Sequence, residues 1–277
     1  MQVIDTHQHF WKYNPVRDAW ITDEMRAIQR DFMPEDLLPI LKANGVDGCV
    51  LVQTDQSEAD NDFQLSNAKK HDFIKGIVGW VDFEADTIED RLKFYCQHKI
   101  VKGFRHVLQG EPQRDFMLRP KFKHGIGLLK HYNFVYDILI FIDQLKYTAE
   151  FVATFPDQPF VIDHIAKPNI PKQEIEEWKR NMQAVAKFEN VSCKISGILG
   201  ERSWNWKESD FTPYLDVIVE AFGPKRIMFG SDWPVCNVAG SYEGVLAIVK
   251  KYFSSFSKNE QELFFGKNAV KFYNLNK

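Results

Sequence analysis

Residues 3–11 read Val3-Ile4-Asp5-Thr6-His7-Gln8-His9-Phe10-Trp11, a short apolar run that passes into an acid and two histidines. Short runs rich in Val, Ile and Phe recur along the whole chain. Several are apolar throughout, which is typical of parallel strands buried on both faces. The predicted strands are Gln2–Asp5, Gly48–Gln53, Lys75–Val81, Val101–His106, Phe134–Ile140, Phe160–Asp163, Val191–Ser196 and Arg226–Gly230.

Segments with helical spacing of apolar residues lie between and after these strands. They include Pro34–Asn44, Gln173–Phe188, Tyr214–Phe222, Tyr242–Phe253 and a closing amphipathic helix over Asn259–Asn274. This alternation over 277 residues predicts an α/β protein with one domain, a (β/α)8 (TIM) barrel spanning residues 1–277. The alternative is an open doubly wound sheet, but no GxGxxG or P-loop motif follows any of the strands.

The composition is that of an ordinary globular chain, with 44% hydrophobic and 26% charged residues. Lys plus Arg number 35 and Asp plus Glu 38, so the net charge of −3 argues against a nucleic-acid or anionic-membrane surface. We expect no secretory signal and no membrane-spanning helix, since no apolar run reaches about 18 residues. The four cysteines form no CxxC pair, so we expect reduced thiols in a cytoplasmic protein.

Side chains that can carry chemistry gather where the predicted strands end. His7 and His9 are two residues apart on an extended strand and therefore face the same side. His164 follows the sixth predicted strand, and Asp232 follows the eighth. Barrel enzymes carry their active sites at the carboxyl ends of the strands, so we expect these four side chains to meet at one centre.

Purely structural roles are alternatives for several polar residues. A single histidine is more often structural than functional, and an HxH pair can simply end a strand. Arg105-His106 could brace the barrel through ion pairs, and Lys194 could be an ion-paired core residue. Asp163 precedes His164 on the predicted strand, so it should face the opposite side and serve structure alone.

Five motifs in combination resemble the amidohydrolase superfamily, and within it the sugar-lactonase group of the amidohydrolase-2 branch. They are Asp5-Thr6-His7-Gln8-His9-Phe10-Trp11, Gly103-Phe104-Arg105-His106, Asp163-His164-Ile165-Ala166-Lys167-Pro168, Lys194-Ile195-Ser196-Gly197 and Phe229-Gly230-Ser231-Asp232-Trp233-Pro234. The group includes L-fucono-lactonases and L-rhamnono-lactonases. The resemblance therefore implies a carboxylic ester hydrolase (EC 3.1.1.-) that opens a sugar-derived lactone to the sugar acid.

The resemblance also implies roles for individual residues. His7 and His9 match the family's histidine pair on the first strand, His164 its sixth-strand histidine, and Asp232 the aspartate that acts as general base. Members with two metals also need a Lys or Glu that ends the fourth strand and a His that ends the fifth. Here Lys102 opens its strand and the fifth strand has no His, so we expect no two-metal site. The resemblance leaves two options, one divalent metal (zinc or manganese) on His7, His9 and Asp232, or a reaction without metal.

The chemistry that follows is attack of water on a lactone carbonyl. Asp232 would take the proton from water, and His164, with Arg105, would stabilise the oxyanion. Sugar lactones present hydroxyls and an apolar ring face, so polar and aromatic side chains near the strand ends are the candidate substrate contacts. These candidates are Arg105, His106, Trp80, Asp82, Asp137, Lys167, Lys194, Trp11, Trp204, Trp206 and Trp233.

Two long connections, Phe10–Met33 and Ile198–Asp210, carry tryptophans and follow strand ends, so we expect both at the mouth of the barrel. Within the superfamily, the alternatives are a metal-dependent decarboxylase and an amide hydrolase. Outside the superfamily, the alternative is a barrel that binds a sugar without turnover. Such a binding protein would not require three histidines and an aspartate at one centre. The expected partner is a small-molecule lactone, and the sequence carries no signal for an oligomeric state.

Overall fold

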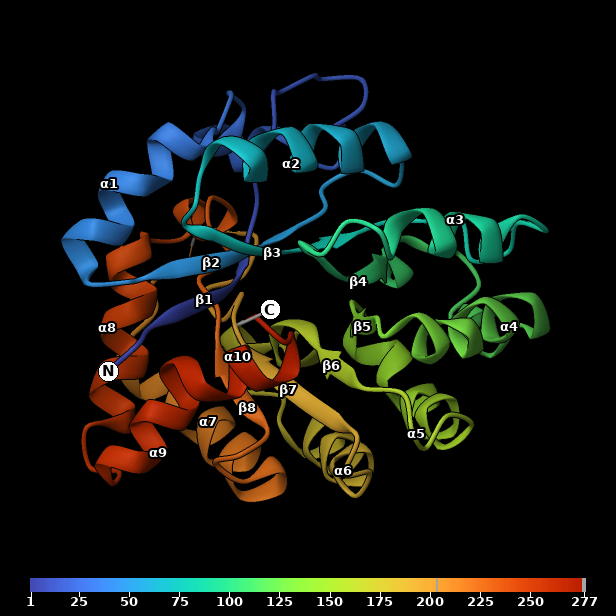
Figure 1. The fold of residues 1–277 in the computed structure, drawn as a ribbon. Helices are drawn as coiled ribbons and strands as arrows, with labels where there is room; N and C mark the ends of the chain where they lie inside the picture. Colours follow the sequence, from blue (N-terminus) through green and yellow to red (C-terminus); the bar gives the residue numbers. More distant parts are fainter. Residues whose placement is uncertain (203, 276–277) are drawn as a thin grey trace.

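The computed structural model describes residues 1–202 and 204–275. Eight parallel strands pair in chain order from β1 to β8, and helices surround them (Figure 1). The strands are β1 (Ile4–Gln8), β2 (Gly48–Val52), β3 (Ile74–Gly79), β4 (Val101–His106), β5 (Val135–Ile138), β6 (Phe160–Ile162), β7 (Val191–Ile195) and β8 (Ile227–Phe229). Gln8 forms a parallel bridge with Trp233, which joins the end of β1 to the segment after β8. The prediction of a (β/α)8 barrel is confirmed.

The helices include each segment that the apolar spacing predicted, and four more between Glu58 and Ala153 that it did not single out. They are α1 (Pro34–Asn44), α2 (Glu58–Lys70), α3 (Ile88–Tyr95), α4 (Pro120–Leu129), α5 (Leu145–Ala153), α6 (Glu176–Ala186), α7 (Glu208–Phe222), α8 (Tyr242–Phe253), α9 (Lys258–Glu262) and α10 (Asn268–Phe272). The first turn of α7 is polar and so escaped the apolar pattern. A π-helical segment, Leu263–Lys267, divides the expected closing helix into α9 and α10. Within residues 1–202 and 204–275, no helix combines the length and the apolar character that crossing a membrane requires.

A cluster of mostly valine side chains fills the interior of the barrel. This inner cluster consists of Val50, Val52, Val78, Val135, Val161, Met228 and Tyr273. An eight-stranded barrel is just wide enough for side chains to fill, which explains the prevalence of valine. Tyr273 follows α10, which lies near the barrel axis in Figure 1. Near the start of β4, the Lys102 ammonium donates to the carbonyl of Asn274 (3.0 Å), so the α10 segment closes the amino-terminal end of the barrel.

Candidate active site

A cavity of about 440 Å³ opens at the carboxyl ends of the strands. Residues that follow six of the strands contribute to its wall: His9, Thr54, Val107, Leu139, His164 and Asp232. The other lining residues are Arg17, Trp20, Asp55, Gln56, Arg105, Gln109, Gly110, Phe141, Lys167, Glu201 and Val235. Active sites of barrel enzymes are assembled in this way from several strand ends.

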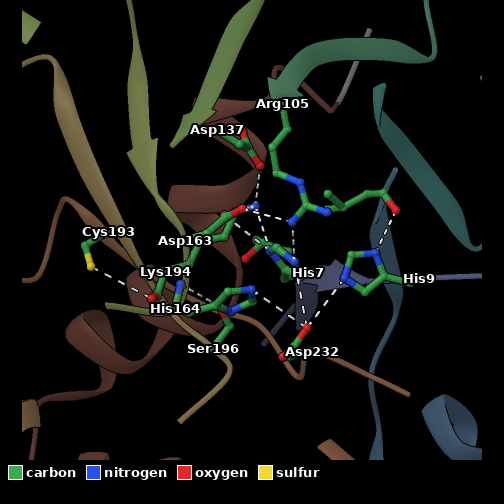
Figure 2. Close-up of polar contacts among 12 residues, drawn as sticks. His7, His9, Arg105, Asp137, Asp163, His164, Cys193, Lys194, Ser196 and Asp232 are labelled. Carbon is green, nitrogen blue, oxygen red and sulfur yellow. Dashed lines mark hydrogen bonds and ion pairs between the residues drawn. The ribbon is translucent and has the colours of Figure 1, made fainter. Parts of the chain in front are cut away.

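Asp232 lies at the centre of three imidazoles on the floor of this cavity (Figure 2). Its Oδ1 is 3.5 Å from Nε2 of His9 and 3.9 Å from Nε2 of both His7 and His164. The His7 ring centroid is 4.9 Å from that of His9 and 4.3 Å from that of His164. All four side chains are buried. The four residues that the sequence placed at separate strand ends thus meet at one point.

A buried aspartate joins β1 to the segment that carries Asp232. The Asp5 carboxylate accepts hydrogen bonds from the backbone N–H groups of His7 (3.1 Å) and Ser231 (2.9 Å). The backbone N–H of Asp232 in turn donates to the carbonyl of His7 (2.8 Å). Asp232 has a φ of 58°, a left-handed conformation that Asp adopts more readily than most residues. These bonds hold the carboxylate over the histidine pair.

The segment after β6 corrects one expectation from the sequence. The strand ends at Ile162, and four successive residues from His164 to Lys167 have positive φ values. Strand alternation therefore stops before Asp163, and both Asp163 and His164 turn toward the centre of the barrel (Figure 2). Gly197 packs directly beside His164, since a Cβ there would lie 2.5 Å from Nδ1 of the ring, and its own φ is 59°. The expectation that Asp163 faces away from the site is wrong.

Hydrogen bonds set the orientation of each imidazole. Nδ1 of His9 lies 2.8 Å from the carbonyl oxygen of Val52, which can only accept, so this nitrogen donates and Nε2 keeps its lone pair toward Asp232. Nε2 of His7 lies 3.2 Å from the Arg105 guanidinium, and Nδ1 lies 3.3 Å from the Asp163 carboxylate. The Lys194 ammonium also lies 3.2 Å from Nδ1, so two cationic donors and a carboxylate together fix the plane of the His7 ring.

In His164 the two ring nitrogens have the opposite roles to those in His9. Ser196 Oγ accepts from the His164 backbone N–H (3.3 Å) and lies 2.9 Å from Nδ1 of the ring. If the hydroxyl donates to Nδ1, the ring carries its proton on Nε2, the nitrogen that faces Asp232. We infer that His164 presents an N–H donor to the cavity, whereas His9 presents an acceptor.

Burial and mutual charge separate the ionisation of the aspartate from that of the histidines. Burial lowers the pKa of His164 to about 4 and holds the pKa of His7 well below its ordinary value. Burial would raise the pKa of Asp232, but the surrounding imidazoles, His164 foremost, favour its ionised form and hold this pKa below its usual range. At neutral pH Asp232 is therefore ionised, whereas the rings of His7 and His164 are neutral.

The structure distributes the expected substrate contacts between the cavity and its surroundings. Arg105 and Lys167 line the cavity. Lys167 pairs with Glu201 at the border of an adjoining cavity of about 460 Å³, which Trp204 also lines. That cavity is mainly apolar, with Phe141, Ile165, Pro168, Ile170, Pro171, Ile198 and Leu199 in its wall.

Other expected contacts lie away from the cavity beside Asp232, and we no longer assign them to substrate. Trp11 and Trp233 are buried against Phe32 in the core, because the connection after β1 folds back and pairs Trp11 with Phe32. The indole N–H of Trp206 donates to the carbonyl of Ala239 (2.8 Å). These tryptophans pack the loops that border the site and do not line its wall.

A second group of expected contacts has partners within the protein. His106 bonds Glu111 (2.7 Å), and Trp80 donates to the other nitrogen of His106 (3.4 Å). Asp82 is exposed and accepts from the backbone of Glu84 (2.9 Å). Asp137 and Lys194 pair with each other in the interior. The core ion pair that was an alternative for Lys194 is thus present.

Asp163 and Ser196 are the residues at the centre that the sequence did not single out as functional. Asp163 contacts His7, Arg105 and Lys194, and Ser196 contacts His164. Both lie within quoted motifs. The role of Asp163 was hidden because strand alternation gives the wrong face beyond the end of β6, whereas Ser196 follows β7 two residues after Lys194, so the same alternation could have located it.

The donor set at Asp232 fits one metal ion. His7, His9 and Asp232 each offer a ligand atom, and these atoms lie within 4.8 Å of one another. Two imidazole nitrogens and a carboxylate oxygen are a common catalytic zinc set, with further positions for water or substrate. His7, Asp163 and His164 form a second such group, but Arg105 and Lys194 already neutralise Asp163. The first group is therefore the better candidate.

Comparison with known proteins agrees with this geometry. A family model described as amidohydrolase matches residues 4–275. L-fucono-1,5-lactonase of Burkholderia multivorans (strain ATCC 17616 / 249) is 34% identical over 284 residues, covering 98% of this chain and 96% of the relative. L-fucono-1,5-lactonase of Burkholderia ambifaria is 31% identical over 99% of this chain and 96% of the relative.

A solved structure has the same fold over its whole length. The crystal structure of an amidohydrolase from Burkholderia multivorans with bound zinc superposes with a TM-score of 0.93 at 33% identity, covering 99% of both chains. The similarity thus includes every strand and helix that builds the site. The chain belongs to the amidohydrolase family.

Proposed function

We propose that this amidohydrolase opens a sugar-derived lactone, such as L-fucono- or L-rhamnono-lactone, to the corresponding sugar acid. The observation that carries the proposal is the Asp232 carboxylate, which three imidazoles approach within 3.5 to 3.9 Å beneath an open cavity. The names of the two full-length relatives, both L-fucono-1,5-lactonases, support the substrate class. The enzyme is then a carboxylic ester hydrolase, EC 3.1.1.-.

Asp232 acts as the general base. Its pKa lies below the usual range, so the carboxylate is ionised at neutral pH and accepts a proton from water as the water attacks the carbonyl carbon. A carboxylate of low basicity activates water only weakly, which suits an activated ester such as a lactone better than an amide. The protonated Asp232 then returns its proton to the ring oxygen as the carbonyl–oxygen bond breaks. This difference in basicity favours a lactone over the amide alternative.

His164 and Arg105 stabilise the charge that develops on the carbonyl oxygen. His164 is neutral near pH 7, because burial lowers its pKa to about 4, and its Nε2–H faces the cavity. Arg105 adds a guanidinium that lines the same cavity and is fixed by the carbonyl of Gln53 (2.6 Å) and the carboxylate of Asp163 (3.2 Å). One such oxyanion donor contributes roughly 10²–10³-fold to kcat in other hydrolases.

A single divalent metal would be held by His7, His9 and Asp232. We favour zinc over manganese, because imidazole ligands suit zinc, whereas manganese prefers oxygen. A metal in this place would polarise the carbonyl or lower the pKa of bound water. The Arg105 guanidinium lies 3.2 Å from Nε2 of His7, so its charge opposes that of the ion and weakens metal binding relative to a site without arginine.

The two cavities suit a deoxy sugar lactone. Polar side chains of Arg17, Asp55 and Gln56 line the cavity beside Asp232 and can bind ring hydroxyls. The adjoining cavity shares Asp232 with it and has a mainly apolar wall, which can receive the methyl group of a 6-deoxy sugar. A dicarboxylate lactone would require more arginines at the mouth than Arg17, Arg105 and the exposed Arg202 provide.

A lactone panel tests the proposal. Aldono-1,5-lactones with a methyl or a hydroxymethyl substituent are mixed with the purified enzyme in dilute buffer, and a pH indicator follows acid release with and without a chelator. We expect acidification above the buffer rate, with a higher kcat/KM for the methyl-bearing lactones. If no lactone is opened while an aromatic acid releases CO₂ in a parallel assay, the decarboxylase alternative replaces the lactonase.

A further inference from the structure

A chain of buried charged groups lies directly beneath His7. The Lys194 ammonium pairs with the Asp137 carboxylate and lies 3.0 Å from Oδ1 of Asp163 and 3.2 Å from Nδ1 of His7 (Figure 2). Asp163 Oδ1 is also the oxygen 3.3 Å from Nδ1 of His7. The side chains of His7, Asp163 and Lys194 are fully buried, as is Asp137. The proposed mechanism assigns no role to Asp137 or Lys194.

The chain begins on an element far from the mouth of the barrel. Tyr273, which follows α10, places its hydroxyl 3.0 Å from both oxygens of Asp137. The tyrosine is 1% exposed, and the Lys194 ammonium lies 5.5 Å from its ring centroid. A residue that closes the amino-terminal end of the barrel is thus linked through two side chains to the catalytic end.

Each link in the chain restricts the next one. The Tyr273 hydroxyl donates its hydrogen bond to the Asp137 carboxylate and so restricts rotation of that carboxylate. That carboxylate, with Asp163, holds the Lys194 ammonium in place. Lys194 and Arg105 contact different oxygens of Asp163, Oδ1 and Oδ2, which fixes the plane of the carboxylate that faces Nδ1 of His7.

Stability alone does not account for such an arrangement. Replacing buried ion pairs by well-packed apolar residues is often neutral or stabilising, so a barrel core has no need of them. Charged partners held at one ring nitrogen of a catalytic histidine set the orientation of the ring. The observed chain ends on two such partners, because the Lys194 ammonium and the Asp163 carboxylate lie 3.2 and 3.3 Å from Nδ1 of His7.

We propose that Tyr273, through Asp137 and Lys194, positions Asp163 and thereby orients His7 for hydrolysis. Tyr273 is a positioning residue, since it touches neither the cavity beside Asp232 nor the carboxylate of Asp232. The inference rests on the proposed function in one respect, because it takes His7 as part of the hydrolytic site. The α10 segment then supports the active site as well as closing the amino-terminal end of the barrel.

The first test replaces Tyr273 with phenylalanine, which removes only the hydroxyl. Changes to outer hydrogen-bond partners of histidines typically cost about 10–100-fold, so we expect kcat for lactone opening to fall about tenfold with KM within about twofold. Rates are referred to the folded fraction from circular dichroism. Tyr214→Phe is the matched control, because the Tyr214 hydroxyl is buried without a hydrogen-bond partner, and it should leave kcat unchanged.

A spectroscopic measurement separates positioning from a general loss of structure. The protein is labelled with ¹⁵N histidine, and the His7 ring signals are identified by their loss in His7→Asn. Tyr273→Phe should shift the ring-nitrogen signals of His7 and leave those of His9 and His164 in place, whereas Tyr214→Phe should shift none. A loosened fold would instead move all three sets of signals.

A second pair of variants guards against instability. Asp137→Asn keeps the shape of the side chain and should shift the same His7 signals, and adding Tyr273→Phe to it should produce no further loss of kcat. Wild-type kcat together with unshifted His7 signals in Tyr273→Phe overturns the inference. If the wild-type enzyme opens no lactone, the proposed function fails, while the His7 signals still report on the positioning chain.

Discussion

Asp232→Asn is the variant that tests the mechanism most directly. The amide keeps the shape of the side chain but has no negative charge and cannot take a proton from water. Asparagine tolerates the left-handed conformation at this position, where φ is 58°. The backbone bond from residue 232 to the carbonyl of His7 (2.8 Å) does not involve the side chain. The variant should therefore fold with a melting temperature close to that of the wild type.

The expected loss follows from the role of the carboxylate. General acid–base catalysis contributes about 10²–10⁴-fold, so kcat should fall by that factor, equivalent to about 3–5 kcal/mol in the barrier. The pKa of His164 is raised by the charge of Asp232, so the variant leaves this ring neutral near pH 7 and its donor intact. KM should change little, because the asparagine amide remains a hydrogen-bonding group in the same place.

Initial rates of acid release from an aldono-lactone measure this effect, after subtraction of the spontaneous rate in buffer. Asp55→Asn is the matched control, since Asp55 lines the same cavity and its carboxylate accepts from the Ser57 hydroxyl (2.7 Å). It should raise KM, if Asp55 binds a ring hydroxyl, and leave kcat near the wild-type value. A kcat of Asp232→Asn within tenfold of the wild type would remove Asp232 from the chemistry.

Three further predictions concern the surroundings of Asp232. Gly197→Ala places a Cβ 2.5 Å from Nδ1 of His164 at a φ of 59°, so it should lower both kcat and the melting temperature, measured by steady-state kinetics and calorimetry. Burial lowers the pKa of His164 from 6.5 to about 4, so the unfolded chain binds more protons between these values. The contribution of His164 to the free energy of unfolding is therefore complete above pH 6.5 and is lost as the pH falls toward 4. The melting temperature of the wild type should decrease over this range, and that of His164→Gln should decrease less steeply. His9→Gln should weaken zinc binding at least tenfold in competition with a chromophoric chelator, whereas His106→Gln, at a histidine paired with Glu111, should not.

The sequence was sufficient to predict the fold and the four central residues. Apolar runs alternate with helical segments, and the period of two in His7 and His9 holds because both residues follow an extended backbone. His164 and Asp232 were located by the rule that barrel sites lie at the carboxyl ends of strands. These inferences depend on local patterns and on one general property of the fold.

The sequence was insufficient wherever a side chain's direction depends on the tertiary path of the chain. The turn after β6 has four successive non-glycine residues with positive φ, for which the sequence carries no signal, so Asp163 was assigned to the wrong face. Trp11 follows a strand and could have faced the mouth, but its connection returns and buries it against Phe32. Lys194 and Asp137 are recognisable as a pair only when β5 and β7 are known to flank β6 in one barrel.

The distribution of charge is the reason that we propose Asp232, rather than the neighbouring Asp163, as the base. Asp163 lies between Lys194 at 3.0 Å and Arg105 at 3.2 Å and is fully buried, so its charge is matched and its oxygens are engaged. Within the described part of the chain, Asp232 has no lysine or arginine paired with it and lines the cavity beside His9 and His164, so its negative charge is the one available to water. Replacing Lys194 would remove one of the two cations that balance the Asp163 carboxylate. Asp163 and Asp232 would then differ less in how far their negative charges are neutralised. The interior cations thus direct the chemistry to a single carboxylate at the surface of the cavity.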